Sequence, residues 1–526
     1  MIIVLSGEIA SGKSSLAAAI GFPIFRTRSA LSSRWHEQNG TTPSRVDLQN
    51  FGEELDAQTE GSWIAQAIPS VMPVGAPIVV DSVRTAQQVD AIRAAFPRHR
   101  VLHVHLEASE EALRARFEQR GDVESYELVK RSPTEQRVNS LRVEADLVID
   151  TSRCSRDDVM LRFLSLVGPI NHEPLVDVIV GGQYGSEGKG HVVSHIAPGY
   201  RMLLRVGGPN AGHTVIDPKT NQKFSFYHLP SGALHAPTAR LVLGPGAVIN
   251  YAVLKKEAEI LGGLDNLVGR LYVDPQAQMI DELDIESEAR LVRSIGSTGQ
   301  GVGSATARKI LGRNEQSTLA RDFEPLKKFL CPTLDLLEES YQLGEHVLLE
   351  GTQGTGLSLH HGHYPYVTSR DTAASGTAGE AGVAPRRIRK SIVVMRTNPI
   401  RVQSPEGGTS GPMGIETTWE EISKRAGIPA DTLREKEKTT TTKRQRRVAE
   451  FCWSDLRRAV LLNSPTDIAL TFVDYISHDN TKARRYEQLT PETLRFIEEI
   501  ERVAGAPVSL VTTRFHRRSI IDRRSW

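Results

Sequence analysis

The sequence of 526 residues is poor in cysteine and has no long hydrophobic run. Its three cysteines are far apart and show no CxxC spacing, which excludes a disulfide framework and a cysteine-based zinc site. Apolar runs such as Ala459–Leu462 fall far short of the roughly 20 residues that a membrane-spanning helix needs. The N-terminus lacks a basic segment, and Glu8 and Lys13 interrupt its apolar residues early, which argues against a secretory signal.

An excess of charge of one sign is also missing, because 64 Lys and Arg residues face 63 Asp and Glu residues. The net charge of +1 gives no global basic field for nucleic acid or for an anionic membrane. Hydrophobic residues make up 39% of the chain, which is typical of a soluble protein with a large core. At roughly 100–200 residues per domain the length predicts two to four domains. We therefore expect a cytoplasmic enzyme that acts on small molecules.

Two segments share one pattern: an apolar run, a glycine-rich turn and then Gly-Lys. They are Met1–Ser15 and Val176–Val193. Each predicts a buried strand, a phosphate-binding loop and a helix, as in parallel α/β sheets. Residues 165–174 contain Pro and Gly and predict a linker between them. The sequence thus predicts an α/β protein with a small domain over residues 1–168 and a larger one over residues 175–526.

Residues 7–14 (GEIASGKS) match the phosphate-loop pattern GxxxxGK[ST] in full. The glycines let successive N–H groups converge on phosphate oxygens, the lysine neutralises phosphate charge, and the Ser14 hydroxyl is a ligand for Mg²⁺. The residues expected to bind the triphosphate are Gly7, Ser11, Gly12, Lys13, Ser14 and Ser15.

The rest of this domain resembles a small nucleoside-monophosphate kinase. Candidate residues for acceptor binding and for a lid that supplies charge are Arg26, Asp81, Arg84, Arg116 and Arg120. Each arginine alone is more typical of a solvated surface. As a set after a complete phosphate loop, they favour phosphoryl transfer over a GTPase switch.

The second loop, residues 181–190 (GGQYGSEGKG), is followed by residues 207–214 (GGPNAGHT). Further motifs come in order at residues 228–232, 295–303, 350–355 and 364–369. Together they resemble adenylosuccinate synthetase over about residues 175–524. The resemblance implies a large α/β domain with a parallel central sheet, Mg²⁺ as cofactor, and a homodimer with the active site near the subunit interface.

The resemblance also implies a reaction. A nucleoside triphosphate, GTP in the family, phosphorylates the 6-oxo group of IMP, and the amino group of L-aspartate then displaces phosphate to give adenylosuccinate. The reaction needs a proton acceptor for ring N1, a proton donor and Mg²⁺ at the transferred phosphoryl group, and a cradle for two carboxylates.

By resemblance, His213 is the general acid and Lys189 holds phosphate. The catalytic set is His213, Ser186, Lys189 and Gln353. The residues expected to bind the monophosphate are Asn210, Thr298, Gln353, Thr368 and Arg313, the last near the place of a basic residue that a partner subunit contributes in the family.

The same resemblance assigns the remaining ligands. Aspartate is expected to bind Thr441, Thr442, Arg444 and Arg446, where two guanidinium groups can fork onto a dicarboxylate. The triphosphate of the ligase reaction is expected to bind Gly185, Glu187, Gly188, Lys189, Gly190, Asp474 and Thr512. The Gly212 carbonyl and Ser186 are the expected Mg²⁺ ligands.

Three positions depart from the family pattern. Ser186 replaces an aspartate that acts as the base for N1, and a neutral hydroxyl cannot replace a carboxylate in that role. A small residue leaves room for a 2-amino group and resembles the phage branch that makes 2-aminoadenine nucleotides from deoxyguanylate. Phe472 replaces a lysine that stacks on guanine, and Arg514 replaces a glycine, so ATP is an alternative donor to GTP.

Several functions therefore stay open. IMP is the leading acceptor, and dGMP is the alternative that Ser186 favours. A catalytically silent nucleotide-binding module that regulates the kinase domain would also explain the lost carboxylate. A nucleic-acid-binding NTPase would use the basic residues at 439–447 and 517–524, but near-zero net charge and a lack of interleaved aromatic residues argue against it.

Overall fold

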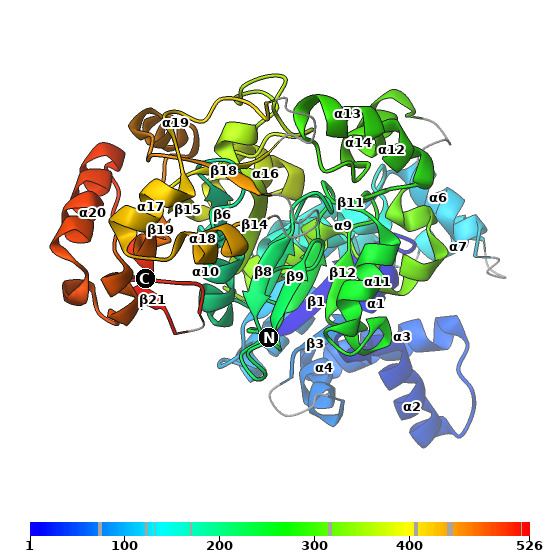
Figure 1. Cartoon of the computed structure of the whole chain (residues 1–526). Coiled ribbons are helices and arrows are strands. Elements are labelled where there is room, and N and C mark those ends of the chain that lie inside the picture. The colour runs from blue at the N-terminus through cyan, green and yellow to red at the C-terminus, as the bar shows by residue number, and fades with distance from the viewer. Residues whose placement is uncertain are drawn as a thin grey trace. The chain divides into compact units, whose positions relative to one another are not determined.

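The computed structural model describes residues 1–71, 76–120, 125–131, 133–168, 171–313, 318–403, 409–438, 445–516 and 518–526. The chain divides into two compact units, Met1–Ile170 and Asn171–Trp526, and this division falls within the segment that the sequence predicts as a linker (Figure 1). No helix in the described part of the chain is long and apolar enough to cross a membrane.

The N-terminal unit is built on one parallel sheet with strand order β2-β3-β1-β4-β5. The strands are β1 Ile2–Gly7, β2 Ile24–Arg26, β3 Ile78–Asp81, β4 Val101–Glu107 and β5 Leu147–Asp150. The helices are α1 Lys13–Ile20, α2 Thr27–Asn39, α3 Arg45–Thr59, α4 Ser62–Ala67, α5 Ala86–Ala95, α6 Glu110–Glu118, α7 Tyr126–Lys130, α8 Pro133–Val138 and α9 Arg156–Val167. Ile2 and Val4 pack into one apolar cluster and Ile3 and Leu5 into another, so helices cover both faces of β1.

The C-terminal unit contains a nine-stranded sheet with order β12-β10-β7-β14-β6-β15-β19-β20-β21. Its strands are β6 Val176–Gly181, β7 Met202–Arg205, β10 Arg240–Leu243, β12 Leu271–Val273, β14 Val347–Gly354, β15 Ile388–Arg396, β19 Asp467–Thr471, β20 Val508–Thr512 and β21 Ile520–Asp522. All neighbours are parallel except β20 and β21, which pair antiparallel. This confirms the predicted α/β architecture with a parallel central sheet.

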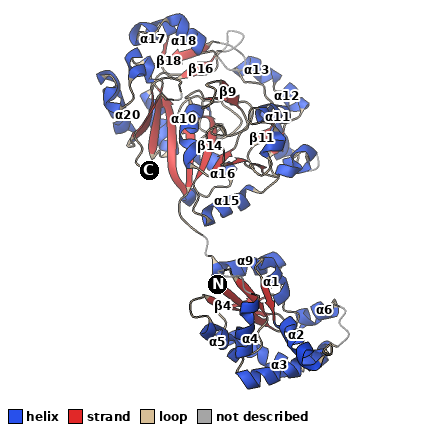
Figure 2. Ribbon diagram, turned by 90° about the horizontal axis from the view of Figure 1, so that it is seen from below, coloured by secondary structure: helices blue, strands red, loops and turns tan. Residues whose placement is uncertain are grey.

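Smaller elements surround this sheet (Figure 2). The strands are β8 His213–Ile216 with β9 Lys223–Phe226, β11 Val248–Ile249 with β13 Gln278–Met279, and β16 Ile400–Val402, β17 Glu416–Thr417 and β18 Arg446–Ala449. The helices are α10 Lys189–Ile196, α11 Tyr251–Glu259, α12 Glu282–Ser287, α13 Ala289–Ile295, α14 Val302–Leu311, α15 Thr333–Gln342, α16 Ala374–Ala381, α17 Trp419–Ala426, α18 Ala430–Lys436, α19 Trp453–Asn463 and α20 Pro491–Ala504.

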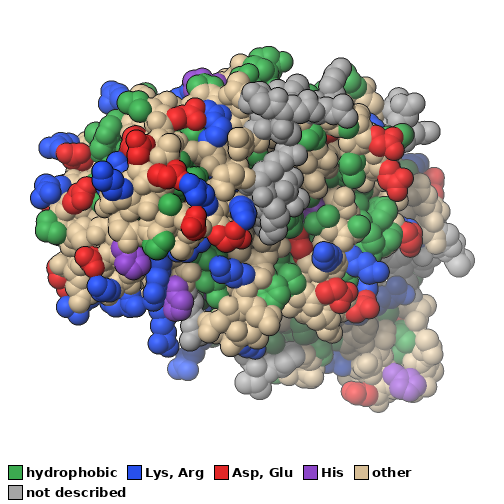
Figure 3. Space-filling model, viewed as in Figure 1, with side chains coloured by type: hydrophobic (Ala, Val, Ile, Leu, Met, Phe, Trp, Pro, Cys, Tyr) green, Lys and Arg blue, Asp and Glu red, His purple; other side chains and the backbone are tan. Residues whose placement is uncertain are grey.

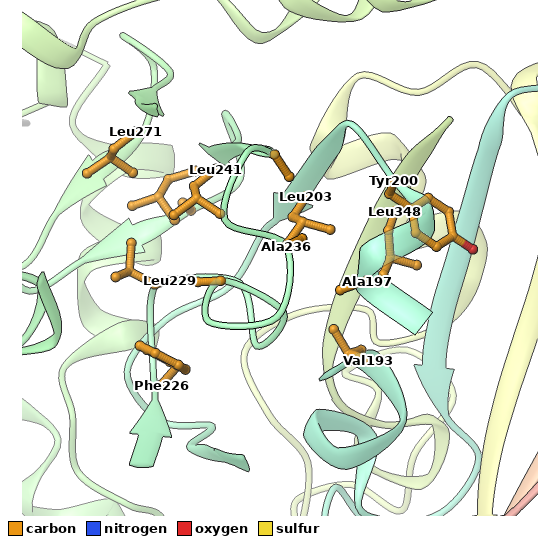
Figure 4. Packing of buried hydrophobic residues seen from close by; sticks show 14 of the residues in the cluster. Val193, Ala197, Tyr200, Leu203, Phe226, Leu229, Ala236, Leu241, Leu271 and Leu348 are labelled. Atoms are coloured by element: carbon orange, nitrogen blue, oxygen red, sulfur yellow. The ribbon is translucent and has the colours of Figure 1, made fainter. Parts of the chain in front are cut away.

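Two apolar clusters fill the two sides of the large sheet. On β6, Ile179 belongs to one cluster and Val178 and Val180 to the other, which matches the continuous apolar run in the sequence. Figure 4 shows the first cluster, where Val193 and Ala197 belong to the segment that follows the second phosphate loop. Burying a side chain of this size contributes about 1.5–3 kcal/mol. Core packing therefore fixes the helix against which the loop is built.

Both phosphate loops leave the carboxyl end of a central strand. β1 lies between β3 and β4, and β6 lies between β14 and β15. Each loop ends at a glycine in the left-handed region, Gly12 (φ 101°) before α1 and Gly188 (φ 87°) before α10. A side chain is strained in this conformation, and glycine lets the backbone N–H groups turn toward an anion at the helix start. The two sheets thus place two separate phosphate sites at their carboxyl edges.

Candidate functional sites

The first loop holds its lysine with backbone oxygens. The Lys13 ammonium donates to the carbonyls of Gly7 (2.8 Å) and Glu8 (2.6 Å), and its side chain is buried. Burial, assisted by the nearby Arg84 guanidinium, lowers the pKa of Lys13 to about 7. Gly7 admits no side chain, because a Cβ there would lie 2.0 Å from the Leu106 carbonyl oxygen. The loop is therefore a tightly packed cradle whose lysine is held by carbonyl oxygens and not by a directly bonded carboxylate.

A cavity of about 710 Å³ opens beside this loop. Seven of the sequence-predicted residues line it: Gly12, Lys13, Ser14, Arg26, Asp81, Arg84 and Arg120. The Ser14 hydroxyl donates to the Asp81 carboxylate (3.0 Å), so two hard oxygen ligands of the kind that Mg²⁺ prefers lie next to Lys13. Ser15 is exposed in the first turn of α1, and Ser11 is buried in the loop.

Arg116 occupies a different place from the other predicted arginines. It does not line the cavity, and its guanidinium donates to the hydroxyl (2.9 Å) and carbonyl (2.6 Å) oxygens of Thr151. The Thr151 hydroxyl in turn donates to the Ser11 carbonyl (3.1 Å). Arg116 therefore supports the loop from behind. Glu135, which sequence reasoning missed, accepts from Arg84 (2.5 Å) and from the Ile9 backbone N–H (3.0 Å).

The second loop holds its lysine with a carboxylate. The Lys189 ammonium donates to Glu187 (2.9 Å) and to the Gln353 carbonyl, and both charged side chains are fully buried. Glu187 also accepts from the backbone N–H groups of Gln183 (3.0 Å) and Gly185 (2.7 Å). This ion pair closes the loop on itself, and its carboxylate satisfies backbone donors that would otherwise be buried without partners.

A second cavity, of about 280 Å³, brings together many predicted ligase residues. Those on its wall are Gly185, Ser186, Asn210, Gly212, Thr298, Gln353, Thr368 and Arg446. The Gln353 amide donates to the Thr368 hydroxyl (2.9 Å), and its backbone is held in the left-handed region at φ 58°. Strain of this kind is stable only where the surroundings enforce it, and here it aims an amide into the cavity.

His213 converges with the second loop. A Cβ on Gly190 would lie 3.0 Å from the His213 Cβ, so the imidazole is packed directly against the loop that ends in Lys189. Nδ1 of His213 contacts Glu350, and Nε2 is buried without a hydrogen-bond partner in the described part of the chain. Glu350, inside a predicted motif but not singled out, is the residue that orients the ring.

The charges around His213 fix its tautomer. Burial opposes ionisation of Glu350, but the neighbouring Arg205 (3.7 Å) and the contacts with His213 and Ser231 together outweigh it and lower the pKa of Glu350 to about 2. An ionised carboxylate only accepts, so Nδ1 of His213 carries the hydrogen. Burial lowers the pKa of His213 to about 4, so the ring of the empty site is neutral and offers the Nε2 lone pair. Negative charge arriving with a phosphoryl group would raise that pKa.

The predicted base-binding end lies near β19. Asp474 is buried, its Oδ1 has no hydrogen-bond partner among the described residues, and burial raises its pKa to about 7. The Thr512 hydroxyl accepts from the Phe472 N–H (3.2 Å). A Cβ on Gly188 would lie 3.4 Å from the Phe472 ring, so this ring stands beside the phosphate loop. The Arg396 guanidinium stacks on the ring at 3.9 Å.

Glu437 links three parts of the site and carried no signal in the sequence. Its carboxylate accepts from Arg396 (2.7 Å), from the Tyr475 hydroxyl (2.6 Å) and, more weakly, from Arg446 (3.4 Å). Arg396 also donates to the Ser186 carbonyl (3.3 Å). Burial opposes ionisation of Glu437, but Arg396 and Arg446 hold its pKa below the usual value. The buried Glu437 carboxylate therefore links the predicted base-binding end at Tyr475, the second phosphate loop through Arg396, and Arg446 of the predicted aspartate clamp.

Some predicted residues lie elsewhere. Thr441, Thr442 and Arg444 lie outside the described residues, and Arg446 is the described member of the predicted aspartate clamp. Arg313 is exposed just after α14 and does not line the cavity. On the face shown in Figure 3, Lys and Arg are interspersed with Asp and Glu over the C-terminal unit, so no broad basic surface appears on that face.

Comparison with known proteins matches both halves. The family model described as adenylosuccinate synthetase matches residues 178–319 and 313–481, and the model described as chloramphenicol phosphotransferase-like protein matches residues 1–165. Adenylosuccinate synthetase of Methanococcus aeolicus is 37% identical over 354 residues, which is 66% of this chain and 99% of the relative. That of Methanocaldococcus jannaschii is 38% identical over 356 residues, 66% of this chain and 96% of the relative.

Two solved structures resemble the larger unit. Succinoaminodeoxyadenylate synthetase of cyanophage S-2L, bound to dGMP and to dATP as an energy donor, is 27% identical with a TM-score of 0.54. The match covers 67% of this chain and 96% of the cyanophage chain. Fully ligated adenylosuccinate synthetase of Plasmodium falciparum has a TM-score of 0.58 at 20% identity, covering 67% of this chain and 100% of its own, and shows the shared fold.

Proposed function

Because the chain belongs to the adenylosuccinate synthetase family, we propose that it joins L-aspartate to C6 of a purine nucleoside monophosphate with a 2-amino group, namely deoxyguanylate. The protein is a C–N bond-forming ligase with a kinase-like N-terminal unit, which confirms the predicted enzyme class. The acceptor and the donor are the parts that we propose.

Ser186 is the observation that carries the acceptor proposal. Its short neutral side chain lines the cavity that also contains Asn210, Gln353 and Thr368. A serine leaves more space beside N1 and C2 of a bound purine than an aspartate does, and a 2-amino group needs that space. The solved cyanophage relative was bound to dGMP, which supports the same acceptor class.

We assign the chemical roles as follows. The triphosphate transfers its γ-phosphoryl group to O6, and the aspartate amine then attacks C6 and expels phosphate. His213, held by Glu350 through Nδ1, presents Nε2 to the oxygen that becomes phosphorylated. The loop that Lys189 and Glu187 hold in shape binds the transferred group through its backbone N–H groups, and Arg446 contributes to binding the aspartate carboxylates. Ser186 binds N1 by hydrogen bonding and is not a general base, so the N1 proton passes to a phosphate oxygen of the triphosphate as O6 forms its bond to the γ-phosphorus.

Mg²⁺ fits this site only together with its substrates. The Ser186 hydroxyl and the Gly212 carbonyl line the cavity as neutral oxygen ligands. The described residues contain no cluster of three or more His, Cys, Asp or Glu side chains for a metal. Mg²⁺ is commonly held by few protein ligands and by substrate phosphates, and it supplies charge for the transferred phosphoryl group. We therefore place it beside these two oxygens.

We infer that the donor is an adenine triphosphate rather than GTP. Phe472 stands where the family has a lysine that stacks on guanine, and Arg396 already covers one face of its ring. The cyanophage relative was bound to dATP as an energy donor. GTP remains the second candidate because buried Asp474 has an oxygen without a hydrogen-bond partner among the described residues, suited to the N–H groups of guanine.

IMP is the second candidate acceptor, since the archaeal relatives at 37% and 38% identity are adenylosuccinate synthetases. The test is to incubate the protein with L-aspartate, Mg²⁺ and dGMP, GMP or IMP, each with ATP, dATP or GTP, and to identify products by mass. We expect product from dGMP. Product from IMP alone would overturn the acceptor proposal, and no product from any combination would support a silent module.

A substitution sharpens this test. Ser186→Asp restores the family carboxylate beside the cavity, and we expect it to shift the preference from dGMP toward IMP by at least tenfold. Ser464→Asp, an exposed position after α19, is the matched control and should leave the preference unchanged. A Ser186→Asp protein that still prefers dGMP would contradict the role of this residue. A homodimer is also proposed from family membership, and light scattering on the intact chain tests it.

A further inference from the structure

We propose that the cavity of the N-terminal unit binds a purine nucleoside monophosphate whose base carries a 2-amino group, and that the unit phosphorylates its 5′-phosphate. The matching family model is named for a chloramphenicol phosphotransferase-like protein, so the acceptor is the point at issue. The residues that line this cavity carry the proposal by themselves, independently of the proposed ligase function.

Several guanidinium groups that have no partner among the described residues line the cavity. Arg26, Arg28, Arg120 and Arg137 all line it and are exposed to solvent there. None of the four makes a side-chain hydrogen bond or ion pair with any residue that the structure describes. Guanidinium groups bind phosphate oxygens in a planar fork, and four of them exceed what the phosphates of one triphosphate require beside Lys13. The surplus fits an acceptor that is itself a phosphate.

The carboxylates of the cavity are occupied in a way that disfavours an alcohol acceptor. A hydroxyl must lose a proton as it attacks, so it needs a free general base. Beside the phosphate loop, Asp81 accepts from Ser14, and Glu135 accepts from Arg84 and the Ile9 N–H. A phosphate acceptor needs no base, because its attacking oxygen is already deprotonated.

The transfer then balances without a proton step. An oxygen of the acceptor phosphate forms a bond to the γ-phosphorus, and the bond from that phosphorus to the β–γ bridging oxygen breaks. The products are two nucleoside diphosphates. Arg26 lies opposite Asp81 in the register of β2 and β3, so one guanidinium stands at the strand ends beside the Ser14–Asp81 pair. It is placed to hold the acceptor phosphate in line with the transferred group.

The inner wall of the cavity presents hydrogen-bond acceptors. Gln88 is fully buried, its carbonyl accepts from the Arg84 N–H (2.7 Å), and its amide donates to both oxygens of Asp56 (2.9 Å). Because this fixes the amide orientation, the group that faces the ligand is the Asp56 carboxylate, which can only accept. Glu53, one turn earlier on α3, also lines the wall.

Such a wall selects bases that carry a donor at C2. Guanine offers N1–H beside its 2-amino group, and 2-aminoadenine offers a 2-amino group beside the unprotonated N1, whereas adenine has no donor at C2 and a pyrimidine base is smaller. Burial raises the pKa of Asp56, so N–H donors would compensate for its lost hydration. Leu31, Leu48 and Trp63 supply apolar contact for a flat ring. If the ligase also uses a 2-aminopurine nucleotide, both units handle one class of base.

The test measures phosphorylation by the intact chain with ATP and Mg²⁺ but without aspartate. Candidate acceptors are dGMP, GMP, 2-aminoadenine deoxynucleoside monophosphate, dAMP, dCMP and chloramphenicol, and diphosphates are separated by chromatography. We expect the three nucleotides with a 2-amino group to exceed dAMP and dCMP by at least tenfold in kcat/KM. Phosphorylation of chloramphenicol with no nucleotide product would overturn the proposal, as would equal rates for all nucleotides.

Two variants separate the parts of the argument. Asp56→Asn should lower kcat/KM for 2-aminopurine nucleotides by at least tenfold and for dAMP by much less, whereas Asp90→Asn, exposed on α5, is its control. Arg26→Ala should raise KM for every monophosphate, with exposed Arg98→Ala as control. ATP binding measured separately confirms that each variant is folded. An Asp56→Asn protein that binds ATP and keeps full discrimination would refute base reading by this residue.

Lys13→Met keeps this inference distinct from the ligase function. It removes the cation from the first loop, so the kinase assay should lose its signal while the aspartate-dependent assay keeps its rate. Phosphorylation that survives Lys13→Met would show that this activity does not belong to the first cavity. Failure of the ligase assay with every acceptor would leave the kinase result intact.

Discussion

The two phosphate loops of this chain start from the same sequence pattern and solve the burial of a lysine differently. Lys13 donates to two backbone carbonyls, and its pKa is lowered to about 7 because burial is not offset by a close carboxylate. Lys189 is paired with Glu187 inside the loop. The first loop thus gains its counter-charge only from a ligand, whereas the second is neutralised before any ligand arrives.

This difference matches what each unit has to do. In the proposed kinase reaction of the first unit, a triphosphate would supply the missing negative charge and the surrounding guanidinium groups would bind a second phosphate. In the second unit the loop has to hold its shape while a base, an amino acid and a triphosphate assemble around His213. Glu187 fixes the backbone N–H groups of Gln183 and Gly185 for that purpose. The same motif therefore fits two kinds of anion site: one whose lysine has no bonded carboxylate, and one whose lysine is already paired with Glu187.

The largest expected effect separates the two units at the level of chemistry. His213→Asn removes the ring nitrogen presented to O6, and a positioned acid or base contributes about 10²–10⁴-fold to rate. We expect ligase kcat to fall by that factor and kinase activity to stay unchanged, measured on one preparation. Exposed His172→Asn is the control. If the His213→Asn protein kept more than a tenth of the ligase rate, the imidazole would have no catalytic role.

The contrast between Lys13 and Lys189 predicts different losses of folding stability when each lysine is replaced. Lys189→Met leaves the Glu187 carboxylate buried without its cation, and breaking a buried pair destabilises by about 3–5 kcal/mol. Lys13→Met removes a desolvated charge that has only carbonyl partners, so we expect a change within about 1 kcal/mol. Hydrogen exchange followed by mass spectrometry reports each unit separately. Equal losses in the two units would show that the two loops do not differ.

Glu437 connects the two ends of the second site, and its replacement tests whether they communicate. Glu437→Gln leaves Arg396 and Arg446 without a shared anion, so we expect KM for aspartate to rise about tenfold, which corresponds to about 1.4 kcal/mol. Aspartate affinity should also lose its dependence on the triphosphate. Exposed Glu435→Gln is the control. A purely structural role would lower kcat and stability without changing that dependence.

The sequence predicted what is local in the chain. The strand, loop and helix at residues 1–20, the α/β class and the family are confirmed, because each rests on contiguous residues. Glu437 and Arg396 escaped notice, since a buried ion pair between residues 41 positions apart leaves no spacing signal. Arg116 looked like a lid residue but binds Thr151, a contact that only the packing of α6 against the end of β5 creates. The binding roles of individual residues stay predictions.

The smallest expected effect is the uptake of a proton by Lys13 when a triphosphate binds to the first loop. A lysine with a folded pKa near 7 and an unfolded value near 10.5 is mostly neutral in the empty site at pH 8 and charged in the unfolded chain. The unfolded state then binds more protons between those values, so this group makes stability rise with pH from about 7 to 10.5. A bound triphosphate raises the pKa of Lys13, and binding at pH 8 should therefore take up nearly one proton. Calorimetry in buffers of different ionisation enthalpy measures this uptake, which Lys13→Met should abolish. Uptake that survives the substitution would place the titrating group elsewhere and would weaken the contrast between a loop neutralised by its ligand and a loop neutralised by its own carboxylate.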